Sequence, residues 1–228
     1  MSIIVYAPNK HIYMQALEGM RERTIVCNSL SKTYSITGWR LGYVVANPQI
    51  IDRVKKVHDF LTVGAAAPLM EAAVVGLEFG DGYYDELAAH YEHMKEVFVG
   101  GLKKLGLKYT DPQGAYYVLV DVSEFGVKDD VKFCEWMTQF VGVAAVPGSS
   151  FFREDVHNLV RFHFAKQDDT LNEAIKRLAT LKRKSDECQE CGLEIIHGNI
   201  LKTDNFSVLC VPGSCRAFHT AVHNIRIS

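Results

Sequence analysis

The chain has 228 residues, of which 48% are hydrophobic and 23% charged, and its formal net charge at pH 7 is −2. This composition excludes global disorder, and the charge gives no electrostatic reason to expect nucleic acid or an anionic membrane as a partner. The opening residues lack the charged and apolar regions of a signal peptide. The most apolar window, Leu61 to Phe79, contains Pro68, Glu71 and Glu78, so no membrane span is predicted. We therefore expect a cytoplasmic protein with reduced thiols.

Residues 1–80 are predicted to be the end of a larger α/β domain. Ile3 to Tyr6 could be a strand fragment, and apolar runs predict buried strands at Thr24 to Asn28 and at Arg40 to Ala46. Helical spacing of apolar residues follows Asn47-Pro48, and a second helix is predicted near Glu71 to Phe79.

Residues 81–184 are predicted to form a second unit, in which helices and strands alternate. A long amphipathic helix is expected from Tyr83 to Leu105, and another around Phe133 to Val141. The capping box Thr170-x-x-Glu173 predicts the start of a last helix that ends near Lys184. Strands are expected at Ala115 to Asp121, Val143 to Val146 and Leu159 to Phe164.

One lysine lies in an unusual place, on the predicted turn between the first two strands. Lys32 is preceded by the hydroxyl residues Ser29 and Ser31, and Arg40 follows eight positions later. A desolvated lysine near other cationic groups becomes a nucleophile for carbonyls. Hydroxyls and an arginine are the groups that bind a phosphate monoester. The pattern therefore indicates Schiff-base chemistry on a phosphorylated aldehyde, the alternative being a solvated loop lysine.

The same segment resembles the signature of the class I/II aminotransferases, which is S-x-S-K followed by G-x-R-x-G. The resemblance implies an α/β protein of fold type I that depends on pyridoxal 5′-phosphate. By that resemblance Lys32 binds the cofactor covalently and is the catalytic residue, and the cofactor site includes the two serines and the arginine. The matched positions are Ser29, Ser31, Lys32, Gly38, Arg40 and Gly42.

The resemblance extends from about residue 3 to residue 184. Gly114 to Tyr117 and Val146 to Ser149 resemble landmarks of the family's small domain. The sequence departs from the family at Phe151-Phe152, where many relatives carry Phe-Gly. Local loop geometry is therefore expected to differ there.

Arg161 is the second candidate functional residue, because it interrupts an otherwise apolar predicted strand. Strand alternation puts Arg161 and His163 on one face, and an arginine charge in such a strand needs an anionic partner. In the family, an arginine at this place binds the α-carboxylate of the amino acid. The alternatives are a buried ion pair or an edge strand with Arg161 in solvent. His163 is interpreted as a packed neighbour.

Family members also carry an aspartate in a D-x-x-Y motif upstream of the lysine, which keeps the cofactor's pyridinium protonated. Residues 1–31 contain no aspartate. The chain is therefore interpreted as the C-terminal part of an aminotransferase, with a remnant of the large domain and the small domain, weakly active or inactive as it stands. The resemblance implies amino acid and 2-oxo acid substrates and a homodimer.

Residues 185–228 leave the family pattern and form an unassigned cysteine-containing tail. A zinc site there is the less favoured interpretation, because the spacing of the second cysteine pair is imperfect. The preferred interpretation is an extension in which cysteines fall by chance, so no metal ligand is assigned. A non-catalytic interaction fragment is the alternative function. The tail's candidate ligands are Cys188, Cys191, Cys210, Cys215, His219 and His223.

Overall fold

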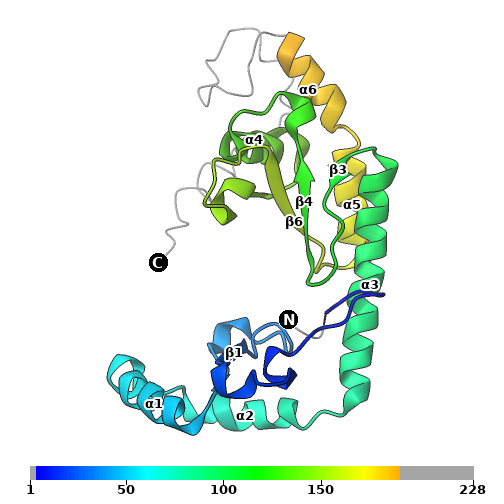
Figure 1. Ribbon diagram of the computed structural model, residues 1–228. Helices are drawn as coiled ribbons and strands as arrows, with labels where there is room; N and C mark the ends of the chain where they lie inside the picture. The colour runs from blue at the N-terminus through cyan, green and yellow to red at the C-terminus, as the bar shows by residue number, and fades with distance from the viewer. Residues whose placement is uncertain (1–3, 191–228) are drawn as a thin grey trace.

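The computed structural model describes residues 4–190, which form two groups of elements connected by one long helix (Figure 1). This helix, α3 (Asp81–Lys104), runs past both groups, which we call the first and the second unit. It confirms the amphipathic helix predicted from Tyr83 to Leu105. Within the described residues, no helix combines the length and apolar character that crossing a membrane would require.

The first unit contains a two-stranded antiparallel sheet and two helices. Strand β1 (Val26–Ser29) pairs with β2 (Gly42–Val45), so that the two ends of the lysine turn lie side by side. Helix α1 (Pro48–Thr62) follows, then α2 (Ala67–Leu77). The Asn47 side chain accepts a hydrogen bond from the backbone N–H of Gln49 at 3.0 Å, which caps α1 where the sequence predicted its start. Short 3₁₀ turns lie at Met14–Ala16, Arg21–Arg23 and Thr37–Trp39.

The prediction that these two strands are buried is wrong. All four residues of β2 are exposed, and Ile25, just before β1, is 52% exposed. The buried hydrophobic cluster of this unit consists of Leu30, Leu41 and Ala73. A two-stranded sheet has two edges and two faces to cover, and within residues 4–190 no third strand pairs with β1 or β2.

The second unit is built on an antiparallel sheet with the strand order β3-β4-β6-β5. Its two longest strands, β4 (Tyr117–Asp121) and β6 (Leu159–His163), lie at the centre, with Leu119 opposite Arg161. Side chains alternate between a buried face and a half-exposed face. The buried face carries Val118, Val120, Val160 and Phe162. The edge strands are β3 (Lys108–Tyr109) and β5 (Val146–Pro147).

Three further helices complete the second unit. Helix α4 (Asp130–Trp136) continues into a π-helical turn, Met137–Val141, as the sequence predicted for this region. Helix α5 (Asp168–Leu178) packs against α3 at Gly101, where an added Cβ would lie 2.5 Å from Ile175 Cγ1, so the helices approach closely because this residue is glycine. Helix α6 (Leu181–Glu190) follows. Short 3₁₀ turns lie at Ser123–Phe125 and Gly148–Phe151.

The predicted start and end of the last helix are wrong. Helix α5 begins at Asp168 with Gln167 as its N-cap, so Thr170 lies inside the first turn and does not cap it. The carboxylates of Asp168 and Asp169 favour this start, because they lie at the positive end of the helix dipole. The helical segment also breaks after Leu178, and α6 continues beyond Lys184. Ser185 is 1% exposed, so this part of the predicted tail packs on the second unit.

The N-terminal segment packs on the second unit. Ile4 and Tyr6 are 3% and 4% exposed and belong to the core of that unit. Val5 forms an isolated bridge with Gly114, and the Tyr6 hydroxyl donates to the Ala115 carbonyl at 2.5 Å. The division at residues 80 and 184 stays a prediction, and within it these first residues associate with the second unit.

Candidate active site

The lysine turn is held together by a chain of hydrogen bonds that meets at Thr37. The Lys32 Nζ donates to Thr37 Oγ1 at 3.4 Å, and Thr37 Oγ1 donates to the Ser31 carbonyl at 3.3 Å. The backbone N–H of Ser31 donates to Ser29 Oγ at 3.2 Å. The Arg40 Nη1 donates to the Thr37 carbonyl at 2.8 Å. All four residues predicted for the cofactor site therefore belong to one network.

The end of the turn has an unusual backbone. Arg40 has a φ of 56°, in the left-handed region that residues with a side chain rarely adopt. Such strain persists only where the surroundings fix it, and it gathers at functional sites. Immediately afterwards, an added Cβ on Gly42 would lie 2.6 Å from the Asn28 carbonyl oxygen, whereas one on Gly38 would meet nothing within 4 Å. Of the two glycines in the motif, Gly42 is thus the one required by a close approach.

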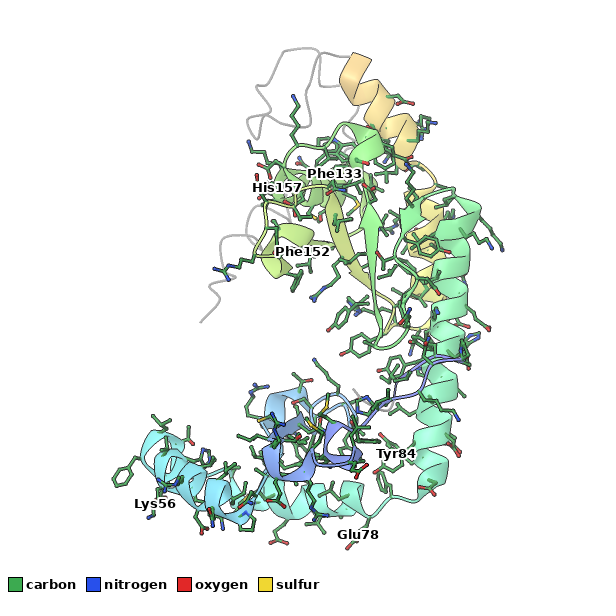
Figure 2. The ribbon with its side chains drawn as sticks, in the orientation of Figure 1. Lys56, Glu78, Tyr84, Phe133, Phe152 and His157 are labelled. Atoms are coloured by element: carbon green, nitrogen blue, oxygen red, sulfur yellow. The ribbon has the colours of Figure 1, made fainter. Side chains whose placement is uncertain are left out.

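A group of aromatic rings anchors the turn to the start of α3. The Tyr83 hydroxyl donates to the Thr33 carbonyl at 2.7 Å, and the hydroxyls of Tyr34 and Tyr84 lie 2.9 Å apart. The rings of Tyr34 and Tyr83 stack at 5.9 Å, and Tyr84 lies beside the first unit (Figure 2). Burial and the hydrogen bond with Tyr84 raise the pKa of the Tyr34 hydroxyl, so it stays protonated at neutral pH.

The chemistry of this turn fits a phosphate monoester with a reactive carbonyl. Ser29 and Arg40 are exposed and Lys32 is half-buried, so their donors face solvent or a ligand. Because Ser29 Oγ accepts from Ser31, its own hydroxyl proton remains able to donate to phosphate. Among residues 4–190, no carboxylate forms an ion pair with Lys32 or Arg40. These cations are therefore not neutralised within the described part of the chain.

Arg161 lies on the half-exposed face of the second sheet. Its guanidinium carbon is 4.3 Å from the ring centroid of Tyr117 and 3.7 Å from that of Phe151. Because β6 is a central strand, Arg161 is not on a sheet edge. No ion pair or hydrogen bond to its guanidinium occurs within residues 4–190. His163 shares this face, as predicted, and is exposed, although partial burial and the charges of Lys166 and Arg161 lower the pKa of its ring; its interpretation as a packed neighbour stays a prediction.

The structure groups the predicted site residues into two places. The lysine turn belongs to the first unit and Arg161 to the second, and the apolar residues around them form separate clusters within the described residues. Sequence patterns did not indicate Thr37, the aromatic anchor or the rings around Arg161. Only the run of Phe79, Tyr83 and Tyr84 could have indicated the anchor.

The tail's candidate zinc ligands are not described: residues 191–228 lie outside the described part, as does the Cys188 side chain. The described residues contain no group of metal ligands.

The family called "Aminotransferase class I and II" matches residues 3–178. The chain belongs to this family. Its members depend on pyridoxal 5′-phosphate, and the fold is that of the fold type I enzymes. The chain is 36% identical over 179 residues to the methionine aminotransferase of Escherichia coli, covering 78% of this chain and 46% of that protein. It is 32% identical over 191 residues to human kynurenine–oxoglutarate transaminase 3, covering 75% of this chain and 42% of that protein.

Solved aminotransferase structures share this fold. The N-succinyldiaminopimelate aminotransferase of Mycobacterium tuberculosis superposes with a TM-score of 0.74 at 32% identity, covering 79% of this chain and 47% of that one. The chain spans about half the length of the curated relatives that it matches. The similarity covers the lysine turn and the strand of Arg161, because both lie inside residues 3–178.

Proposed function

We propose that this chain carries the cofactor-binding lysine, part of the phosphate site and the substrate-binding arginine of a pyridoxal-phosphate-dependent aminotransferase. The reaction is the transfer of an amino group between an amino acid and a 2-oxo acid. The observation that carries the proposal is the hydrogen-bond network that joins Ser29, Ser31, Lys32 and Arg40 through Thr37. These four residues fill the family's motif at every functional position.

Lys32 is the catalytic residue of the proposal. When bound, pyridoxal phosphate supplies an electron sink for the substrate Cα. Lys32 would hold the cofactor through its amine and, when that amine is free, would act as the base and acid that moves a proton at the substrate Cα. The only side-chain partner of Lys32 within the described residues is the Thr37 hydroxyl, at 3.4 Å, which is long for a hydrogen bond and leaves the amine free to react.

Ser29, Ser31 and Arg40 form the phosphate side of the site. The Ser29 hydroxyl and the Arg40 guanidinium would donate to phosphate oxygens, and charge-assisted bonds of this kind are among the strongest in proteins. Ser31 is 6% exposed and fixes Ser29 through its backbone N–H, so its role is to hold the turn in shape.

Arg161 is proposed to bind the substrate α-carboxylate. The guanidinium is planar, and the two neighbouring rings fix the orientation of this plane, along whose edge a carboxylate would accept two parallel hydrogen bonds. The ion-pair and edge-strand alternatives are not supported, because the described residues offer no anionic partner and β6 is central.

We also propose a homodimer in the cytoplasm. Apolar side chains are exposed along α1 and β2, among them Phe60 at 92% and Leu61 at 76%, which supports an association that covers them. Within the described residues, Cys27 and Cys134 form no disulfide, which supports a reducing compartment.

The proposal is tested by absorbance spectroscopy of the purified chain with pyridoxal phosphate. Covalent attachment to Lys32 predicts a pH-sensitive visible band that disappears in Lys32→Arg, which keeps the positive charge, and persists in Lys103→Arg, an exposed position on α3. Addition of an amino acid should convert the band if the chain is active. A spectrum equal to that of free cofactor would favour the alternative, a non-catalytic interaction fragment.

A further inference from the structure

The ring of Phe151 lies against the guanidinium of Arg161, although hydrophobic burial does not hold this ring in place. Phe151 is 48% exposed, yet its ring centroid lies 3.7 Å from the Arg161 guanidinium carbon. Burial alone does not fix an exposed phenylalanine, so the loop that carries it must be positioned by other contacts. This loop runs from the end of β5 to the start of β6.

A single buried carboxylate joins the two ends of this loop. Asp130, the first residue of α4, is completely buried, and its Oδ2 accepts from the backbone N–H of Ser149 at 2.7 Å. Its Oδ1 lies 3.1 Å from Nδ1 of His157, at the far end of the loop. His157 also contacts Asp155, with its Nε2 2.7 Å from Oδ1. Asp130 thus fixes the backbone of Ser149, two residues before Phe151, and the side chain of His157 at the far end of the loop.

The loop is also seated on the strand that carries Arg161. An added Cβ on Gly148 would lie 2.5 Å from the Leu159 carbonyl oxygen, so the turn before Ser149 packs directly on the first residue of β6. His157 and Phe152 lie on the same side of the second unit, near α4 (Figure 2). The position of the Phe151 ring therefore depends on Asp130, because Asp130 holds the loop that carries this ring.

We propose that Asp130 and His157 form a clasp that holds Phe151 on the Arg161 guanidinium, and that Phe151 controls access of a carboxylate to this arginine. Asp130, His157 and Phe151 are positioning residues, because they act through Arg161. The carboxylate as ligand rests on the proposed function, whereas the clasp rests on the contacts above. An amino acid or 2-oxo acid would bind along the edge of the guanidinium that the rings leave open.

The clasp is tested by the rate at which phenylglyoxal modifies Arg161 in the full chain, measured by peptide mass spectrometry. Phe151→Ala should raise the rate about two- to fivefold, the equilibrium factor that corresponds to an exposed cation–π contact. Phe151→Tyr, which keeps a ring, should restore the slow rate. Phe152→Ala is the matched control, because the neighbouring ring makes no contact with the guanidinium. An unchanged rate in Phe151→Ala would overturn the proposal.

The role of the clasp is tested by Asp130→Asn and His157→Gln in the same assay. Each should raise the rate at Arg161 and leave that at Arg53, on α1, unchanged. Because Cys134 is 5% exposed, its failure to react with a thiol reagent shows that a variant is folded. Arg161 rates equal to wild type in both folded variants would refute the clasp. If Asp130→Asn unfolds, His157→Gln, at a half-exposed position, decides.

Protection by acetate separates this inference from the proposed function. If acetate slows modification of Arg161 in the wild type, the carboxylate role of this arginine is supported. If acetate has no effect while Phe151→Ala still raises the rate, the clasp stands and the substrate role of Arg161 fails.

Discussion

The Tyr83 hydroxyl donates a hydrogen bond to the carbonyl oxygen of Thr33, the residue next to Lys32, at 2.7 Å. Tyr83 lies in the first turn of α3, so the lysine turn is fixed directly to the helix that carries the second unit at its other end. The stacked ring of Tyr34 reinforces this link. The Lys32 side chain therefore belongs to a turn that is anchored to α3 by a hydrogen bond and a ring stack.

Tyr83→Phe should loosen the lysine turn without removing the ring stack. Loss of one hydrogen bond to a partly buried carbonyl predicts a fall in the free energy of unfolding of about 0.5–1.5 kcal/mol. Urea unfolding measures the change, and amide hydrogen exchange should become faster at Ser31 to Tyr34. The control is Tyr13→Phe, because Tyr13 is exposed and its hydroxyl makes no hydrogen bond within the described residues. Equal exchange in both variants would contradict the anchoring role.

The two motif glycines should respond differently to alanine. In Gly42→Ala the new Cβ would lie 2.6 Å from the Asn28 carbonyl oxygen, so the β1–β2 pairing must shift, and the free energy of unfolding should fall by about 1–3 kcal/mol. Gly38→Ala meets open space and should stay within about 0.5 kcal/mol of wild type. Thermal or urea unfolding of the two variants, compared side by side, checks the difference. Equal destabilisation would show that the close approach at Gly42 does not matter.

The clasp should make the second unit sensitive to pH. Hydrogen bonds that the His157 ring donates to the Asp130 and Asp155 carboxylates raise the pKa of His157 above its ordinary value of about 6.5. A histidine whose pKa is raised by folding contributes stability that is complete below the unfolded pKa and is lost as pH rises through the folded pKa. His157 therefore stabilises the fold in mildly acidic solution and loses this effect toward alkaline pH.

The contribution of Asp130 to stability depends on pH in the opposite direction. Burial alone would raise the pKa of its carboxyl, but hydrogen bonds from Ser149 and His157 outweigh burial and the net pKa lies below its usual range. Its contribution is present above the unfolded pKa of about 3.9 and is lost as pH falls through the folded pKa. Together the two groups predict that the clasp is strongest between roughly pH 4 and pH 6.5.

The pH dependence is measured by urea unfolding of wild type and His157→Gln at pH 5.5 and at pH 8.5. The stability difference between the two proteins should be larger at the lower pH. His90→Gln serves as control, because His90 makes no hydrogen bond or ion pair within the described residues. A difference that stays constant or grows with pH would rule out a charged His157 in the clasp.

Much of the fold could be predicted because its signals are local. Asn47 before Pro48 marks the start of α1, and the apolar face from Tyr84 to Phe98 marks α3. The prediction that a capping box at Thr170 starts the last helix was wrong, because two aspartates upstream start the helix earlier. The prediction that β1 and β2 are buried was wrong, because an apolar run predicts a strand but does not show which elements cover it.

The candidate site could be predicted only where one short motif carries it. Lys32, Ser29, Ser31 and Arg40 lie within one turn, so their grouping follows from the sequence. The anchoring contact between Thr33 and Tyr83 joins residues fifty positions apart. Asp130 and His157, which no motif connects, meet only because α4 and the β5–β6 loop pack together. Long-range contacts of this kind depend on tertiary packing, which sequence periodicity does not encode.

The most direct test of the proposed function is to locate the bound cofactor. The chain is incubated with pyridoxal phosphate, reduced with borohydride, digested and mapped by mass spectrometry. We expect the phosphopyridoxyl group on Lys32, because its amine contacts Thr37, which also binds the proposed phosphate ligand Arg40, and is not paired with a carboxylate within the described residues. Label found mainly on exposed lysines such as Lys103 or Lys182, and equally in Lys32→Arg, would contradict the proposed function.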